Sequence, residues 1–223
     1  QGHLSPARPA MTRIALIHAL AHSVEPINAA FAQDWPEATR MNLLDDSLSV
    51  DLARAGQGLD AAMHARFEAL AAYAVGTGAH GILFTCSAFG PCIARVAALH
   101  PQIPVLKPNE AMVVEAVATG RRIGLIASFA PTLQSMPPEF PAGTPLQLAL
   151  AEGAMAALNA GNGDLHDSLV AAQAQRLQRE GCKVIALAQF SMARARSLCE
   201  AATGLPVLTT VDSAVAALKR RLA

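Results

Sequence analysis

Arg13–Ala19 reads RIALIHA and Arg122–Ser128 reads RIGLIAS, and this pair of matching segments decides the fold. Each is a short apolar run that follows an arginine, which is typical of a buried β-strand. A second pair repeats the relation, because Gly81–Ser87 reads GILFTCS and Val184–Phe190 reads VIALAQF. Each member of the second pair is followed by a helical segment and then by a Pro-Val-Leu strand. Self-similarity of this kind predicts two halves that are built alike.

Short apolar runs alternate along the chain with longer, Ala-rich segments of helical period. This order is typical of parallel β-strands joined by crossover helices. The expected strands span residues 14–17, 39–43, 81–85, 105–106, 123–127, 184–188 and 207–208, and the longest expected helices span 51–75, 110–118, 165–178 and 191–202. The Pro- and Gly-rich stretch Pro131–Thr144 is predicted to be a long loop that acts as a lid.

The predicted fold class is α/β, with two pseudo-symmetric lobes that each contain a parallel sheet. The lobes are expected to face each other across a pseudo-twofold axis, with the active site in the cleft at the carboxyl ends of the strands. Residues 11–105 form lobe 1 and residues 106–205 form lobe 2 in this division. Residues 206–223 supply the last strand and a C-terminal helix. The sequence leaves two places for this helix, one on lobe 1 and one on lobe 2. Residues 1–10, which begin QGH, are expected to be a tag scar or a disordered N-terminal extension before a native start at Met11.

The composition excludes several classes of partner. The 223 residues include 17 Lys and Arg against 17 Asp and Glu, so neither a nucleic acid nor an anionic membrane surface is expected as a partner. Residues 69–94 contain no Lys, Arg, Asp or Glu, but Gly and Pro interrupt them, so they are interpreted as helix end, strand and turn, not as a membrane span. Scattered histidines and four cysteines without a Cys-x-x-Cys pair predict no metal site, and the cytoplasm is the expected compartment.

Cys86 is the first candidate for chemistry, because it ends a predicted strand and opens a helix with Pro91 near its first turn. The N-terminus of a helix favours a thiolate and also binds carboxylates, so one geometry would supply an activated sulfur and an anion pocket. A packed core cysteine is the alternative. Cys92, Cys182 and Cys199 lie within helices or before a strand and are expected to be structural.

Six strings of the sequence resemble the aspartate/glutamate/hydantoin racemase superfamily, and the resemblance covers nearly all of Met11–Ala223. They are IALIH at 14–18, LDDS at 44–47, FTCSAFG at 84–90, PVLKPNE at 104–110, RIGLIAS at 122–128 and LAQFSM at 187–192. The resemblance implies two flavodoxin-like lobes and an enzyme that needs no cofactor. In racemases of this superfamily, two cysteines flank the α-carbon of a small carboxylate. One removes the α-proton, and the other returns a proton on the opposite face.

The position of the second family cysteine holds Gln189, whereas Cys86 matches the first. Glutamine exchanges hydrogen bonds but has no proton to titrate, so it cannot act as a general base. His18 and His22, which follow the first strand, are candidates for the missing acid or base, since histidine titrates near neutrality. The leading hypothesis is a racemase or isomerase that acts at the α-carbon of a small carboxylic or amino acid through Cys86. A single-cysteine decarboxylase of malonate-type acids and a non-catalytic protein that binds small carboxylates are the alternatives.

Hydroxyl groups near the strand ends are the candidates for carboxylate binding. By their position in the family, Ser87, Ser128 and Thr132 are expected to surround the substrate carboxylate, and helix capping is the alternative for Ser128 and Thr132. Asp45 and Ser191 are further candidate substrate-binding residues, and a solvated loop is the alternative for Asp45. The expected partner is a small-molecule carboxylate, and the chain is expected to form a homo-oligomer.

Overall fold

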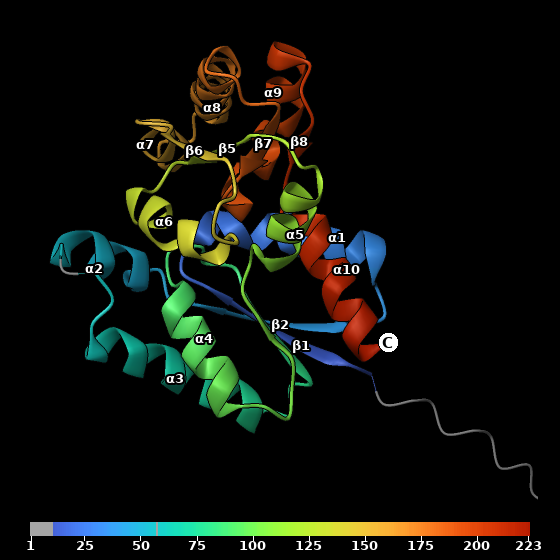
Figure 1. Ribbon diagram of the computed structural model, residues 1–223. Helices are drawn as coiled ribbons and strands as arrows, with labels where there is room; N and C mark the ends of the chain where they lie inside the picture. The colour runs from blue at the N-terminus through green and yellow to red at the C-terminus, as the bar shows by residue number, and fades with distance from the viewer. Residues whose placement is uncertain (1–10, 57) are drawn as a thin grey trace, which may run out of the picture.

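Two four-stranded parallel sheets with flanking helices organise the computed structural model, which describes residues 11–56 and 58–223. The expected tag scar or extension at 1–10 lies outside the described residues. In Figure 1 the blue to green half of the chain forms the lower lobe, and most of the yellow to red half forms the upper lobe. The prediction of an α/β protein with two lobes and parallel sheets is confirmed.

Lobe 1 has the strand order β2-β1-β3-β4. Its strands are β1 (Arg13–His18), β2 (Thr39–Leu44), β3 (Gly81–Phe84) and β4 (Val105–Leu106), and its helices are the 3-10 segment η1 (Ala21–Ser23), α1 (Val24–Asp34), α2 (Ser47–Ala55), α3 (Ala61–Gly76) and α4 (Gly90–Leu99). Side chains alternate across β1, because Ala15 and Ile17 pack with α2, α3 and α4, whereas Ile14 and Leu16 pack with α1. Burial on both faces explains why β1 and β3 are continuous apolar runs in the sequence.

Lobe 2 repeats this arrangement with the strand order β6-β5-β7-β8. Its strands are β5 (Ile123–Ala127), β6 (Leu146–Leu150), β7 (Val184–Leu187) and β8 (Val207–Leu208), and its helices are α5 (Glu110–Ala118), α6 (Ala130–Ser135), α7 (Ala154–Asn159), α8 (Gly163–Arg179) and α9 (Arg196–Thr203), with 3-10 segments η2 (Pro137–Glu139) and η3 (Phe190–Ala195). Apolar side chains of α8, among them Val170 and Leu177, pack on one face of this sheet beside Ile185. The opposite face packs with α5 through Met112 and Val113.

The two sheets agree in register as well as in strand order. Ile14 pairs with Gly81 in lobe 1, and its counterpart Ile123 pairs with Val184 in lobe 2. The pairings of β3 with β4 and of β7 with β8 agree in the same way. The sequence repeat is therefore a structural repeat. Cys86 and Gln189 occupy equivalent positions, just past β3 and just past β7.

The C-terminal helix α10 (Val211–Leu222) leaves lobe 2 and packs on lobe 1. Its buried residues Val215 and Leu218 join Ile14, Leu16 and Phe31 in one apolar cluster. Strand β8, directly before α10, pairs with β7 in the lobe 2 sheet. Figure 1 shows α10 in red beside α1 in blue. The chain thus crosses between the lobes after β4 and again after β8.

The expectation of one helix over 51–75 is wrong, because the structure has two helices there, α2 and α3. Gly56 and Gly58 separate them with positive φ values of 61° and 73°, a conformation that glycine adopts without strain. Asp60 then begins α3, and its side chain accepts a hydrogen bond from the backbone N–H of Met63 at 2.8 Å. The break allows α2 to take a direction of its own.

The expectation of a long loop over Pro131–Thr144 is also wrong, because much of this stretch is helical. It contains most of α6 and all of η2, and each of them has a proline in its first turn, where proline is well tolerated. Strand β6, which follows, is not among the predicted strands. It lies at the edge of its sheet and is only partly buried, so its sequence lacks the continuous apolar run of a central strand.

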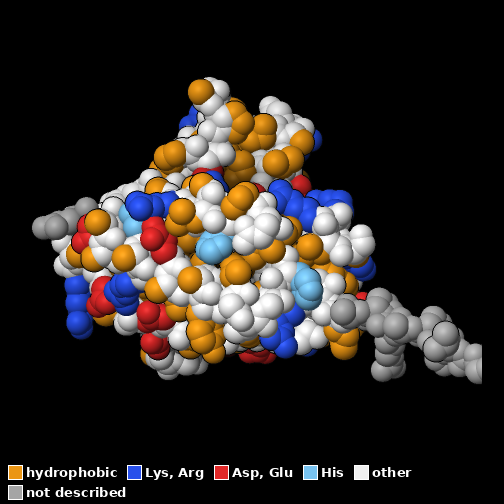
Figure 2. Space-filling model, turned by 90° about the horizontal axis from the view of Figure 1, so that it is seen from below, with side chains coloured by type: hydrophobic (Ala, Val, Ile, Leu, Met, Phe, Trp, Pro, Cys, Tyr) orange, Lys and Arg blue, Asp and Glu red, His pale blue; other side chains and the backbone are white. Residues whose placement is uncertain are grey.

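The surface of lobe 1 carries charges of both signs. Figure 2 shows Lys and Arg side chains interspersed with Asp and Glu across this face, in keeping with the 17 basic and 17 acidic residues of the chain. Within the ranges that the structure covers, no helix has the length and apolar character needed to cross a membrane.

Candidate active site

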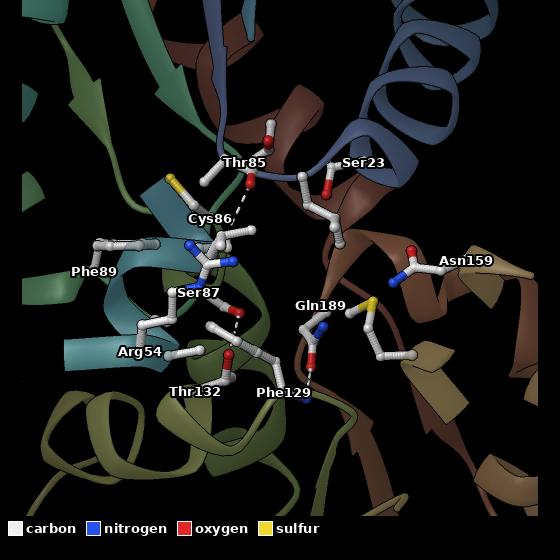
Figure 3. A pocket seen from close by; sticks show the side chains of 17 residues that line it. Ser23, Arg54, Thr85, Cys86, Ser87, Phe89, Phe129, Thr132, Asn159 and Gln189 are labelled. Atoms are coloured by element: carbon white, nitrogen blue, oxygen red, sulfur yellow. Dashed lines mark hydrogen bonds between the residues drawn. The ribbon is translucent and has the colours of Figure 1, made fainter. Parts of the chain in front are cut away.

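A cavity of about 360 Å³ lies between the two lobes at the carboxyl ends of their central strands. Lobe 1 contributes the segment Thr85–Phe89 and part of α2, and lobe 2 contributes Phe129, Thr132, Asn159 and Gln189. Figure 3 shows these side chains around one space, with the Thr85–Phe89 segment on one side and Gln189 and Asn159 on the other. Parallel α/β sheets bind ligands at this position. The cavity is therefore the candidate active site.

Cys86 lines the cavity as a free thiol with 7 % of its surface exposed. Burial raises the pKa of the Cys86 thiol well above its ordinary value, because little water is present to stabilise a thiolate. The expected activation by a helix N-terminus is not found, since α4 begins only at Gly90 and burial dominates. In Figure 3 the sulfur is turned away from Gln189. In this conformation Cys86 is a neutral thiol, which is a proton donor.

Gln189 binds the turn between β5 and α6 with its side chain. Its Oε1 accepts hydrogen bonds from the backbone N–H groups of Ser128 at 2.7 Å and Phe129 at 3.0 Å. Its Nε2 donates to the hydroxyl of Ser191 at 3.4 Å, and the Ser128 hydroxyl lies 3.3 Å from Oε1. Ser128 and Ser191 are thus partners of Gln189 and are not among the residues that line the cavity. The Gln189 carboxamide thus accepts the hydrogen bonds of two backbone N–H groups at this wall of the cavity.

The hydroxyl groups of Ser87 and Thr132 meet across the lobes at 2.9 Å. Both residues are buried and line the cavity. Each hydroxyl has one hydrogen and two lone pairs, so the pair keeps one donor for a ligand after making its mutual bond. A second contact of α6, from the backbone N–H of Gly90 to the hydroxyl of Ser135 at 3.1 Å, holds this helix against the start of α4.

Several residues that line the cavity are absent from the sequence-based prediction, among them Arg54 and Asn159. Arg54 lies in the last turn of α2, and in Figure 3 its guanidinium extends toward Ser87. It makes no ion pair with any residue that the structure describes. Asn159 holds His22 with its Oδ1, at 2.9 Å from Nε2 of the imidazole, and its amide nitrogen points toward the cavity in Figure 3. No local sequence pattern distinguishes Arg54 from a surface arginine, because only the fold brings α2 to the cavity.

His18 is buried behind the cavity wall and does not line the cavity. Its Nδ1 lies 2.7 Å from Oγ1 of Thr85, which does line the cavity, and its Nε2 lies 2.9 Å from Oδ1 of Asn42. Burial lowers the pKa of His18, although the hydrogen bond to Asn42 acts in the opposite direction. His18 therefore has no direct access to a ligand in this structure.

Asp45 also lies outside the set of cavity residues. Its carboxylate accepts a hydrogen bond from the backbone N–H of Ser47 at 3.0 Å and lies 3.4 Å from the guanidinium of Arg66. Burial alone would raise the pKa of Asp45, but the hydrogen bonds from Ser47 and the charge of Arg66 together hold it below its ordinary value. The structure thus gives this carboxylate partners within lobe 1.

The other cysteines lie in the cores of the lobes. Cys92 is in α4, Cys199 is in α9, and Cys182 comes shortly before β7. Burial raises the pKa of Cys92 to about 11 and that of Cys199 to about 11. Across residues 11–56 and 58–223, no three His, Cys, Asp or Glu side chains gather in a way that could hold a metal ion.

The chain belongs to the Asp/Glu/Hydantoin racemase family, whose sequence profile matches residues 19–218. Among solved structures, glutamate racemase from Bacillus anthracis is similar, with a TM-score of 0.74, 10 % identity and coverage of 95 % of this chain and 81 % of that one. Aspartate racemase from Picrophilus torridus gives a TM-score of 0.69 at 12 % identity and covers 94 % of both chains. The Gly74Cys mutant of arylmalonate decarboxylase gives 0.60 at 14 % identity, with 93 % of this chain and 92 % of that one covered. No protein with a curated sequence matches the chain significantly.

Proposed function

We propose that this protein is an enzyme that works at the α-carbon of a small carboxylic or amino acid, with Cys86 as its acid or base. The observation that carries the proposal is the cavity between the lobes, in which a free thiol stands beside groups that suit a carboxylate. The membership of the racemase family supports it.

The donors of the cavity fit an anion. Ser87 and Thr132 offer a hydroxyl donor, Asn159 offers its amide nitrogen, and Arg54 supplies a positive charge. Arginine matches a carboxylate with two parallel hydrogen bonds. The same donors would stabilise the enediolate that forms when the α-carbon loses a proton or CO₂, because the negative charge then moves onto the carboxylate oxygens.

Racemisation or another isomerisation through Cys86 remains the leading reaction in this proposal. The thiol first has to turn toward the α-carbon, a rotation of one side-chain bond between staggered positions. Once the thiol proton has passed to water, the Cys86 thiolate would remove the α-proton, which gives a carbanion and restores the thiol. That thiol can return a proton only to the face from which it was taken. This reaction needs an acid or base on the second face as well, and Gln189 is not one.

Decarboxylation of a malonate-type acid is the second candidate, and two observations favour it. Burial keeps the Cys86 thiol protonated, and Gln189 offers no second base. Loss of CO₂ generates the carbanion without any base, so that only one proton donor is required. A neutral thiol at one wall of the cavity meets that requirement.

Isotope exchange and gas release separate these reactions. The protein is incubated in deuterium oxide with amino acids, hydroxy acids and malonates, and α-carbon label and CO₂ release are followed for each compound. Label without CO₂ indicates an isomerase, and CO₂ release indicates a decarboxylase. Binding without either indicates a non-catalytic carboxylate-binding protein, which contradicts the proposal.

The variant Cys86→Ala tests whether turnover requires the sulfur of Cys86. Cys182→Ala is the matched control, because Cys182 is a buried cysteine remote from the cavity. The rate is expected to fall by roughly 10² to 10⁴ in Cys86→Ala and to stay near that of the parent in Cys182→Ala. A Cys86→Ala protein that turns over like the parent rules out this assignment.

A further inference from the structure

An apolar ridge between two grooves lies on α5, away from the cavity. Val114 of α5 is 69 % exposed, a larger fraction than for any other large apolar side chain within residues 11–56 and 58–223. It lines a groove of about 460 Å³ toward Pro141 and a second groove of about 490 Å³ toward α10. A single exposed valine is common on protein surfaces, so the grooves and the charges beside Val114 have to indicate its role.

The second groove joins the two lobes, because it lies between α5 and α10. These two helices are side by side in Figure 1. α5 packs on the lobe 2 sheet through Met112 and Val113, whereas α10 packs on lobe 1 through Val215 and Leu218. A molecule that occupies this groove therefore contacts both lobes.

The side chains along the middle of this groove are small. Ala111 of α5 and Ala216 and Ala217 of α10 line it. The side chains at a helix contact set the distance between the two axes, so alanines allow another helix to approach closely. A helix that carries a protruding valine fits a groove of this kind, and α5 is itself such a helix.

The two walls of the groove carry opposite charges. Glu110 and Glu115 lie on the α5 wall, and Arg220 and Arg221 lie on the α10 wall. None of the four forms an ion pair with another residue in the described part of the chain. A partner of one charge sign is repelled by one of the walls. A partner that brings both signs, arranged as they are here, is attracted by both.

We propose that a second copy of this chain docks on this face, with Val114 of each copy in the groove between α5 and α10 of the other. A two-fold axis along the groove places α5 of each copy over α10 of the other, so the same surface is used twice. The acidic wall then meets the basic wall on both sides of the axis. The groove shares no lining residue with the cavity, so this inference is independent of the proposed function.

Sedimentation equilibrium of the parent, Val114→Asp and Leu99→Asp tests the ridge. Leu99→Asp is the matched control, because Leu99 is also an exposed apolar side chain but lines neither groove. The parent and the control are expected to form dimers of equal affinity. The dissociation constant of Val114→Asp is expected to rise roughly a hundredfold, because its dimer would bury two unpaired carboxylates. A Val114→Asp dimer as tight as that of the parent overturns the proposal. So does a parent that is monomeric at about 100 µM, where a dimer with a dissociation constant of about 1 µM is largely formed.

Charge reversal tests how the two copies are arranged. The variant Glu110→Lys/Glu115→Lys makes the α5 wall basic, and the variant Arg220→Glu/Arg221→Glu makes the α10 wall acidic. Each variant alone is expected to dimerise roughly tenfold or more weakly than the parent, because walls of like charge meet in its dimer. An equimolar mixture is expected to regain the affinity of the parent, since walls of opposite charge meet on both sides of the axis in the mixed dimer. A mixture that associates no better than the separate variants overturns the proposal.

Dimers regained in the mixture also show that both variants fold, and circular dichroism checks each variant alone. Glu110 accepts a hydrogen bond from the backbone N–H of Lys107 at 2.9 Å, so the single variant Glu115→Lys replaces the double one if helix content is lost. Species larger than a dimer would indicate head-to-tail association, which overturns the two-fold arrangement. No ligand is present in these experiments, so they decide the proposal whether or not the cavity binds a carboxylate.

Discussion

Glu139 holds its carboxyl group in surroundings that oppose ionisation. Its side chain is 10 % exposed, and Oε1 has no hydrogen-bond partner among the residues described. Burial raises the pKa of Glu139 to about 7. Lys107 acts against this shift, but its Nζ lies 3.7 Å away, beyond hydrogen-bond distance, and Glu110 adds a second negative charge nearby. Burial therefore outweighs the ion pair.

A raised carboxyl pKa makes the free energy of unfolding depend on pH. Between the ordinary value of 4.5 and about 7, folded Glu139 keeps its proton while the unfolded chain has lost it, so stability falls as pH rises through this window. Glu139→Gln stays neutral at every pH and avoids this loss. We expect the variant to match the parent near pH 4 and to exceed it near pH 8 by up to about 3 kcal/mol. Urea unfolding of both proteins across this range measures the difference, and parallel curves would show that Glu139 ionises normally.

Arg54 brings a positive charge to the cavity, so its removal should weaken the binding of any carboxylate. A hydrogen bond to a charged group contributes about 1.5 to 3 kcal/mol, and the exposure of Arg54 reduces this through solvent screening. Arg54→Met is therefore expected to weaken binding roughly tenfold. Arg95→Met, on the exposed side of α4, is the matched control and should bind as the parent does. Titration calorimetry with the acid that the parent binds most tightly measures the affinity of both variants. Equal affinities would place the carboxylate away from α2.

At the scale of elements, α6 is joined to the turn that carries Cys86. Thr132 meets Ser87, and Ser135 accepts from the backbone N–H of Gly90. These two residues lie one turn apart on α6, so one face of a short helix spans the segment between β3 and α4. Space there is limited, because a Cβ on Gly90 would lie 3.1 Å from Oγ of Ser135.

Ser135→Ala leaves the partly buried N–H of Gly90 without its acceptor. The free energy of unfolding is expected to fall by about 1 to 3 kcal/mol, the range for a lost partner of a buried donor. Ser168→Ala, on an exposed position of α8, is the control and should change stability little. Thermal and urea unfolding compare the three proteins. A Ser135→Ala protein as stable as the parent would mean that water replaces the hydroxyl.

The central elements could be predicted from the sequence, whereas the edges and the site details could not. β1, β3, β5 and β7 are buried on both faces and appear as apolar runs, and their repeat also gives the equivalence of Cys86 and Gln189. β6 is an edge strand with mixed polarity. The place of Arg54 depends on the break after α2, and that of His18 on contacts with Thr85 and with β2. Such contacts arise from packing between distant segments, which no local pattern records.

At the scale of the whole molecule, the repeat sets Cys86 and Gln189 at equivalent positions of two facing lobes. Both line the same cavity, yet their side chains are held differently. Gln189 is bound to its own lobe by three hydrogen-bond partners at Ser128, Phe129 and Ser191, whereas Cys86 is a thiol that forms no disulfide. The pseudo-symmetric backbone thus carries an asymmetric cavity, with a thiol on one wall and a carboxamide on the other.

Gln189→Cys would place a thiol on each wall and so tests whether the lobes form a two-sided site. Proton transfer by a positioned group contributes about 10² to 10⁴ in rate, so the variant should exchange or racemise the α-proton of an acid that the parent handles on one face only. Gln189→Ser is the matched control, because it also frees the backbone N–H groups of Ser128 and Phe129 but supplies no thiol. One enantiomer of the acid is incubated with each protein in deuterium oxide. The deuterium label at the α-carbon and the chirality of that carbon are followed together. We expect Gln189→Cys to gain α-proton exchange or racemisation and Gln189→Ser to show no gain. We expect the double variant Cys86→Ala/Gln189→Cys to lose the gain. Equal gain in the serine variant would assign the effect to the freed backbone donors, and gain that survives in the double variant would mean that Cys86 takes no part.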